Sequence, residues 1–347
     1  METLWFYLVA IMIAVYVVLD GFDLGAGALH LLVARTDSER RKVLQSIGPV
    51  WDGNEVWLLA GGGALVLAFP KLYASAFSGF YLPLMMVLWL LILRAISIEF
   101  RSHVDSPVWR PLWDVVFSLS SILLAVFLGA ALGNVVRGVP LGPDGYFFLP
   151  LWVSFSATGE ELGILDWFTV TVGITSFLAL TYHGAMWLIL RTDGSVRDRA
   201  GKLSNVVWPI LLALVVLVTV LAFRVQPHLL ERMRDHPVAW ALPILAIAGL
   251  AASRFLSRRG KELWAFLTSA SFLALMLVSV VFSLYPLVLP AAGVVEASLT
   301  IHNASGPPYS LRVALLWWIP GMALVILYTT VMYRQMGGKV EVDPDAY

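Results

Sequence analysis

The sequence of 347 residues contains no cysteine and few charges, and both shortages limit what the protein can be. Without cysteine it can form no disulfide, thiolate-ligated haem, iron–sulfur cluster or cysteine–zinc site. Charged residues make up only 13% of the chain, whereas 59% is hydrophobic and 14 residues are Trp, which excludes a water-soluble globular domain. The net charge is zero, so no basic field attracts nucleic acid, and nucleic acid is not an expected partner.

Long apolar segments predict an all-α integral membrane protein with nine transmembrane helices. Each segment has roughly the 20 mainly apolar residues needed to cross the hydrocarbon core of a bilayer. We expect them near residues 4–33, 50–69, 72–98, 112–136, 165–190, 203–223, 237–253, 263–288 and 313–333. The first segment follows no basic stretch and is too long for a signal peptide, so we expect it to be retained.

The loop charges predict the orientation of these helices. Loops after segments one, three, five and seven, together with the C-terminal tail, hold 16 of the 23 Lys and Arg residues, and the opposite loops hold six. Loops rich in Lys and Arg face the cytoplasm. We therefore expect the N-terminus outside and the C-terminus in the cytoplasm, as an odd number of crossings requires.

A repeated tripeptide indicates how the helices are grouped. Arg35-Thr36-Asp37 recurs as Arg191-Thr192-Asp193, four helices later and at the same side of the membrane, which favours a parallel four-helix repeat followed by a ninth helix. The chain would then divide into a first bundle with the polar residues (1–136), an outer loop (137–164), a second bundle (165–290), another outer loop (291–312), and the ninth helix with its tail (313–347).

The acidic and basic residues expected deep in the membrane all lie in the first three segments. They are Asp20 and Asp23 in the first, Asp52 and Glu55 in the second, and Arg94 in the third. Segments six to nine contain no Asp, Glu, Lys or Arg. A charge at the bilayer centre costs at least about 2.5–3.5 kcal/mol, so such residues usually face the bundle interior or a water path. Asp114 and Asp166 fall at helix starts, and we interpret them as helix caps.

Helix geometry places these residues in an order. At about 1.5 Å per residue, Asp23 lies roughly 15 Å inside the expected cytoplasmic end of its helix. Arg94 and Asp52 lie within a turn or two of that face, and Glu99 follows at the surface. The series Glu99, Arg94, Asp52, Glu55, Asp23, Asp20 is typical of a proton-uptake route. The alternative is an ion-paired cluster that only fixes helix packing.

Small and aromatic residues surround the acidic ones. Gly21 and Gly25 form a GxxxG pattern beside Asp20 and Asp23, which predicts a close approach of helices. The run Gly61-Gly62-Gly63 is interpreted in the same way. Trp51 and Trp57 flank Asp52 and indicate packing or an interfacial anchor.

Two histidines, His30 and His183, lie near helices, and they are isolated from other ligand types. We interpret both as packed or hydrogen-bonded side chains and predict no metal ligand in this chain.

Several motifs carry a family resemblance. The stretches are Asp20-Gly21-Phe22-Asp23-Leu24-Gly25, Ile47-Gly48-Pro49-Val50-Trp51-Asp52-Gly53-Asn54-Glu55-Val56-Trp57, Leu93-Arg94-Ala95-Ile96, Glu99-Phe100-Arg101-Ser102, His183-Gly184-Ala185 and Ser298-Leu299-Thr300-Ile301. Together they resemble subunit II of cytochrome bd-type quinol oxidases, and the resemblance covers effectively the whole chain.

The resemblance implies a nine-helix subunit of two four-helix bundles plus one extra helix, in the bacterial cytoplasmic (inner) membrane. It would form a heterodimer with a haem-bearing subunit I that holds haems b and d and the quinol site, in some members with small single-helix subunits or a structural quinone. Such a complex oxidises quinol and reduces oxygen to water, with protons drawn from the cytoplasm. This chain would ligate no cofactor itself.

Individual roles follow from the same resemblance. Asp52 of the Trp51-Asp52-Gly53-Asn54 motif is similar to the proton-channel carboxylate of the family, with Asp23 and Arg94 as network partners, and Trp57 matches a tryptophan on an oxygen path. Two other hypotheses stay open: a proton-coupled membrane transporter, and a purely structural assembly subunit.

Overall fold

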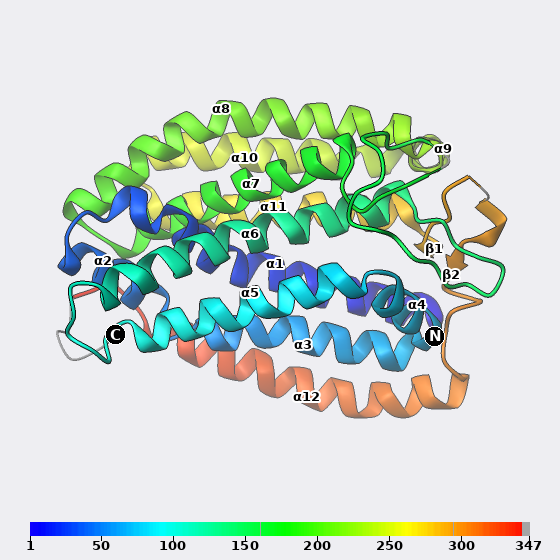
Figure 1. Cartoon of the computed structure of the whole chain (residues 1–347), viewed down its shortest axis with the longest axis horizontal. Coiled ribbons are helices and arrows are strands. Elements are labelled where there is room, and N and C mark those ends of the chain that lie inside the picture. Colours follow the sequence, from blue (N-terminus) through cyan, green and yellow to red (C-terminus); the bar gives the residue numbers. More distant parts are fainter. Residues whose placement is uncertain (160, 294, 342–347) are drawn as a thin grey trace.

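Long apolar helices lie side by side along the molecule (Figure 1). The computed structural model describes residues 1–159, 161–293 and 295–341. Within these residues, eight helical segments are long and apolar enough to cross a membrane. They are α1 (Glu2–Val33), α5 (Tyr81–Phe100), α6 (Trp109–Arg137), α7 (Trp167–Arg191), α8 (Gly194–Val225), η1 (Pro237–Trp240) joined to α10 (Ala241–Arg258), α11 (Glu262–Leu284) and α12 (Pro308–Gln335).

The predicted second segment is helix α3 (Trp51–Ala68), which is not among these eight helices. Its first two turns hold Asp52, Asn54 and Glu55, and these residues lower its mean hydropathy. The helix nevertheless lies alongside the long helices, against α1 and α12 (Figure 1). It brings its polar residues to the side of α1.

The predicted third segment, 72–98, is wrong as one helix, because the chain forms two. Helix α4 (Pro70–Gly79) ends where Phe80 interrupts the helical backbone, and α5 follows. Gly79 is pressed against Phe147 of the loop after α6, where an added Cβ would lie 2.2 Å from the ring. Pro83 in the first turn of α5 has no N–H to continue a helix from α4.

The two ends of the molecule differ in structure. One end, here called the α2 end, carries the short helix α2 (Asp37–Ile47), which begins with a capping box between Thr36 and Glu39. The opposite end, here called the β end, carries α9 (Pro227–Asp235), η2 (Val295–Ala297) and the antiparallel strands β1 (Leu287–Leu289) and β2 (Leu299–Thr300). No helix forms among the described residues between Arg137 and Trp167, where the sequence predicts an outer loop.

Helix α1 is the central element and crosses α7 at glycines. A Cβ at Gly25 would lie 2.0 Å from the Leu180 carbonyl oxygen, and one at Gly184 would lie 2.3 Å from the Gly25 carbonyl carbon. The close approach predicted for Gly21 and Gly25 is therefore confirmed. In the glycine run of α3, Gly61 is buried and packs at ordinary distance against α1, whereas the close packing predicted for Gly62 and Gly63 is wrong within this chain, because nothing lies within 4 Å of a Cβ built at either.

Candidate functional site

The deepest charged cluster joins three helices. Arg94 of α5 donates through Nη2 to Asp20 Oδ1 of α1 at 2.5 Å and to Glu55 Oε2 of α3 at 3.1 Å. Arg94 and Asp20 are completely buried, whereas Glu55 is partly exposed. At about 1.5 Å per residue, Asp20 lies roughly 20 Å from the end of α1 at Val33. The cation and the two carboxylates therefore meet far inside the bundle.

Asp23 binds an amide group instead of a cation. Asn54 Nδ2 donates to Asp23 Oδ2 at 2.8 Å and to the Leu19 carbonyl oxygen at 3.3 Å. The Asn54 side-chain oxygen accepts a hydrogen bond of 3.0 Å from the Tyr333 hydroxyl of α12. Nothing in the sequence distinguishes Tyr333 from the other tyrosines, because it lies in a mainly apolar helix far along the chain from Asp23. Only the tertiary structure links α12 to Asp23.

The deep cluster contains more carboxyls than cations. Asp20 and Glu55 share a single guanidinium, that of Arg94, whereas Asp23 bonds the Asn54 amide. Among the described residues, Asp20 Oδ2, Asp23 Oδ1 and the Nε and Nη1 atoms of Arg94 are buried without a hydrogen-bond partner. Buried polar atoms normally bond to protein or water, so these atoms can bind water along a route through the cluster. A cluster with spare carboxyls can also take up and release a proton.

Asp52 and Glu99 lie on the outer surface of the chain, apart from this cluster. Both side chains are exposed, and neither makes a hydrogen bond or ion pair within the described part of the chain. Asp52 is the second residue of α3, and Glu55 stands three residues later on the same helix face. Of the predicted series, Arg94 thus contacts Asp20 and Glu55, whereas Asp52 approaches the cluster only through Glu55.

The motif residues around Asp52 mainly pack. Trp51 and Trp57 are buried, and Trp57 belongs to a small apolar cluster with Met12 and Tyr16 of α1. Gly53 faces α12, where an added Cβ would make an ordinary 3.8 Å contact with the Tyr328 ring. These positions therefore hold α3 against α1 and α12.

A second buried ion cluster lies at the α2 end. Asp114 of α6 accepts hydrogen bonds from His30 of α1 at 2.7 Å, from Arg40 of α2 at 2.8 Å and from Arg101 after α5 at 2.6 Å. Arg101 also donates to Asp37 at the start of α2, at 2.7 Å. The side chains of Asp114, His30 and Arg101 are almost fully buried. This cluster, here called the α2-end cluster, ties four elements of the chain together.

The interpretation of Asp114 as a helix cap is wrong. Helix α6 begins at Trp109, three residues earlier than the sequence predicts, so Asp114 lies in its second turn and bonds side chains of other elements. Asp166 is the N-cap of α7 as predicted, and it accepts hydrogen bonds from the backbone N–H groups of Phe168 and Thr169. Asp166 also pairs with Arg137 at the end of α6.

The two histidines near helices are hydrogen-bonded, as predicted. His30 binds Asp114, and His183 bonds through Nδ1 to Ser269 at 2.7 Å and through Nε2 to the Val18 carbonyl oxygen at 3.1 Å. Across the described ranges, no group of three or more His, Asp or Glu side chains is placed to hold a metal ion.

An apolar cavity of about 350 Å³ lies beside another face of α1. Val17, Gly21 and Leu24 of α1 line it, together with residues of α6, α7, α8, α10 and α11. Asp20 and Asp23 do not line the cavity, whereas Tyr16, one turn before Asp20 on α1, and Leu58 of α3 do. The walls match an apolar group better than a polar one.

The surface helix α2 is held by ion pairs outside the membrane spans. Glu39 accepts hydrogen bonds from Arg199 of α8 at 2.8 Å, from Ser195, and from the backbone N–H groups of Arg35 and Thr36. The hydrogen bond from Arg199 is the largest cause that lowers the pKa of the Glu39 carboxyl to about 2. Burial raises the pKa of Asp37, but the hydrogen bonds and positive charges of Arg101, Arg41 and Arg110 together outweigh burial and leave the pKa lowered.

Known proteins similar to this chain share most of its length. Residues 1–336 match a family model described as cytochrome bd terminal oxidase subunit II. The cytochrome bd-I ubiquinol oxidase subunit 2 of Escherichia coli K12 is 30% identical over 363 aligned residues, which cover 97% of this chain and 94% of that protein. The cytochrome bd ubiquinol oxidase subunit 2 of Bacillus subtilis 168 is 33% identical over 317 residues, covering 90% and 89%.

A solved structure has the same fold. The structure of bd oxidase from Geobacillus thermodenitrificans matches with a TM-score of 0.76, over 96% of this chain and 98% of that one, at 18% sequence identity.

Proposed function

The chain belongs to the cytochrome bd terminal oxidase subunit II family, and from this premise we propose that it carries protons from the α2 end of the membrane toward a haem-bearing subunit I. Family membership makes the chain a subunit of a quinol oxidase complex, an oxidoreductase that reduces oxygen. The observation that carries the proposal is the group of Asp20, Glu55 and Arg94, which has more carboxyls than cations and lies beside the exposed Asp52, three residues before Glu55 on α3.

The proposed route begins at Asp52 and runs inward along α3. Asp52 takes up a proton at the α2 end, and Glu55, one helical turn deeper on the same face, receives it. Glu55 and Asp20 both bond the same nitrogen of Arg94, so a proton on one carboxyl leaves the other paired with the cation. Asp23 is the second deep carboxyl, joined to α3 through Asn54. Glu99 at the end of α5 adds a further exposed carboxylate at the surface where protons enter.

The partner subunit is proposed to cover the exposed face of α3. Asp52, Val56, Leu59 and Gly63 form one stripe along this helix at helical spacing, and all four are exposed. A carboxylate near the membrane is stabilised by protein or water and not by lipid tails. The open space beside Gly63 allows a helix of subunit I to approach closely. Through this contact the proton route that begins at Asp52 would reach the haem-bearing chain. Trp57 lies on the same helix, where the family resemblance implies an oxygen path.

We also propose that α3 is a ninth membrane crossing. Helix α1 starts at the β end, where Glu2 bonds His302, and α12 finishes at the α2 end, where Met336 bonds Arg191. Ends on opposite sides need an odd number of crossings, and α3 supplies the ninth. Nine crossings give two four-helix bundles followed by α12, in agreement with the repeated tripeptide. The basic residues of the loops support a cytoplasmic position for the α2 end.

Cofactors of the complex are assigned mainly to the partner. Haems b and d would be held by subunit I, as membership of the family implies. A structural quinone fits the apolar cavity beside α1, with Val17, Gly21 and Leu24 against its apolar surface. The quinone would contribute apolar packing there, and the proposed proton route does not pass through it.

Replacement of Asp52 by Asn tests the proposal. We expect the assembled, haem-replete complex to lose at least about tenfold of its quinol-driven oxygen consumption, because Asn cannot carry a proton. In vesicles, proton uptake from the side of the α2 end should fall equally, and Asp52→Glu should restore both. Asp105→Asn, the same change at an exposed loop position of that end, is the matched control. Normal oxygen consumption by an assembled Asp52→Asn complex would refute the proposed proton route.

A further inference from the structure

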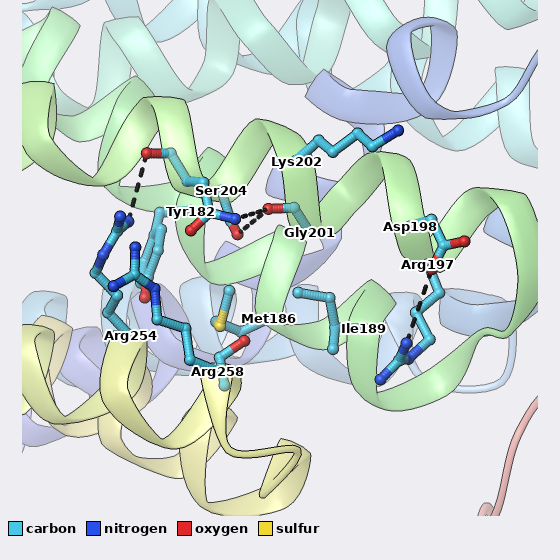
Figure 2. Close-up of a pocket in the computed structure, with 12 residues that line it drawn as sticks. Tyr182, Met186, Ile189, Arg197, Asp198, Gly201, Lys202, Ser204, Arg254 and Arg258 are labelled. Atoms are coloured by element: carbon cyan, nitrogen blue, oxygen red, sulfur yellow. Dashed lines mark hydrogen bonds and ion pairs between the residues drawn. The ribbon is translucent and has the colours of Figure 1, made fainter.

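A basic pocket lies at the α2 end of the second half of the chain, between α8 and α10 and above α7 (Figure 2). Its volume is about 350 Å³. Tyr182, Met186 and Ile189 of α7 form an apolar floor, and the side walls come from the first turns of α8 and the last turns of α10. The pocket is remote from the deep charged cluster, which involves α1, α3 and α5.

The charge lining this pocket is strongly positive. Arg197, Lys202, Arg254 and Arg258 line it, and Asp198 is the only acidic side chain among the lining residues. Arg197 is already held by Glu262 at 2.6 Å, which leaves three cations facing one acidic residue. Neither Lys202 nor Arg258 forms an ion pair in the part of the chain that the structure describes.

Arg254 and Arg258 are placed to act together. They stand four residues apart on α10, and Figure 2 shows both side chains extending from α10 toward α8. Arg254 lies over the Trp208 ring of α8, with its guanidinium carbon 4.7 Å from the ring centre, and it makes only a long 3.4 Å bond to the Asn205 carbonyl oxygen. Two like charges at this spacing repel each other, so a bound anion stabilises the pair.

We propose that this pocket binds the phosphate headgroup of an anionic phospholipid, such as phosphatidylglycerol, from the membrane leaflet at the α2 end. Basic pockets between membrane helices on the cytoplasmic side are suited to anionic headgroups. Arg254 and Arg258 bind the phosphate, and the apolar floor of α7 accepts the glycerol backbone. The proposal needs only that the α2 end lies at a membrane surface, so it stands independently of the proton route.

The surroundings of the pocket favour a lipid over a free anion. A space of about 350 Å³ holds a headgroup but not two acyl chains. Further into the membrane, α8 presents the exposed side chains of Val206 and Ile210, 61% and 49% accessible, along which the acyl chains can lie. A free phosphate ion gains nothing from this apolar surface, whereas a lipid adds burial of its chains to the ion pairs.

The test measures lipid binding to the whole oxidase complex. The complex is delipidated in mild detergent and supplied with mixed micelles that contain either phosphatidylglycerol or phosphatidylcholine, and bound lipid is counted by native mass spectrometry. We expect retention of phosphatidylglycerol and little phosphatidylcholine. Arg254→Gln/Arg258→Gln should weaken phosphatidylglycerol binding about tenfold or more, since each basic residue near the surface contributes to the attraction.

Matched variants separate this site from general surface charge. Arg259→Gln/Lys261→Gln removes two cations from the same end of the membrane, and neither residue lines the pocket. Arg258→Gln alone removes an exposed charge and leaves the contact between Arg254 and Trp208 intact. If the double variant fails to fold, this single variant still tests lipid binding. Equal weakening in the control, equal binding of phosphatidylcholine, or displacement of the lipid by millimolar inorganic phosphate each overturns the proposal.

Discussion

The two buried ion clusters of this subunit are built from the same residue types but differ in charge balance. In the deep cluster, Asp20 and Glu55 share Arg94 and Asp23 bonds Asn54, and among the described residues one carboxylate oxygen of Asp20 and one of Asp23 lack a hydrogen-bond partner. In the α2-end cluster, both carboxylates are paired: Asp114 bonds three nitrogen donors, and Asp37 bonds Arg101.

The difference separates a cluster suited to proton transfer from one suited to holding helices together. A carboxylate that is hydrogen-bonded to cations is stabilised in its ionised form and does not readily take up a proton. Its removal leaves the buried cations without a compensating charge. A carboxyl without its own cation can change protonation while its neighbours stay paired. We therefore assign the α2-end cluster to assembly and the deep cluster to proton movement, and the following variants test that division.

The same substitution in the two clusters should have opposite consequences, and this is the largest expected effect. Asp114→Asn leaves Arg101 and Arg40 without their carboxylate, so the free energy of unfolding should fall by about 3–5 kcal/mol and little haem-containing complex should be recovered. Asp23→Asn keeps the shape of the side chain and its bond with Asn54, so assembly should be retained. Oxygen consumption by that complex should drop at least about tenfold.

Recovered complex is measured by haem absorption after purification, and activity is expressed per haem. Stable, fully assembled Asp114→Asn with reduced activity would reverse the assignment of the α2-end cluster. An Asp23→Asn complex that turns over normally per haem would show that Asp23 serves packing alone.

Tyr333→Phe should have a smaller effect that sharpens the role of α12. The change removes one hydrogen bond to Asn54, which contributes about 0.5–1.5 kcal/mol, while the ring stays in place. We expect a modest loss of thermal stability and a partial decrease in oxygen consumption, because Asn54 becomes less well fixed against Asp23. Tyr328→Phe, on the same helix and exposed, is the matched control. Identical behaviour of the two variants would mean that the Tyr333 hydroxyl does not support the deep cluster.

The smallest predicted effect concerns the partly exposed Glu39, which tethers α2 to α8. Its pKa is lowered from an ordinary 4.5 to about 2, chiefly by Arg199, so its contribution to stability is present above 4.5 and is lost as the pH falls toward 2. Near neutral pH, Glu39→Gln should destabilise the complex by about 1 kcal/mol or less, because solvent screens the pair. The difference from the unmodified protein, measured by thermal unfolding, should shrink as the medium is acidified.

Asp198→Asn provides the comparison for Glu39. Asp198 is exposed and forms only a 3.8 Å pair with its neighbour Arg197, so this variant should show no such pH dependence. A constant difference between Glu39→Gln and the unmodified protein at every pH would contradict the predicted contribution of the carboxylate charge.

Most of the helices and the main polar residues follow from the sequence alone. Apolar length predicts the spans, because a bilayer leaves the backbone no other way to satisfy its hydrogen bonds. Charges are scarce in the apolar segments, so Asp20, Asp23, Glu55 and Arg94 can be picked out from the sequence. A charge inside a membrane is energetically costly and therefore usually has a structural or functional role. The GxxxG pattern around Gly25 predicts a close helix crossing, because glycine has no side chain to hold the two backbones apart.

Only the tertiary structure decided which of these residues meet. Helix periodicity gives the face of a side chain but not the helix opposite, so the partners of Arg94 and the link from Tyr333 to Asn54 could not be predicted. Asp114 was indistinguishable from a helix cap, because its role depends on His30, Arg40 and Arg101, which come from three other parts of the chain. The break at Phe80 depends likewise on the distant Phe147. The sequence thus determined a membrane helix bundle with rare internal charges, whereas packing between helices decided which carboxylates are paired with cations and which are not.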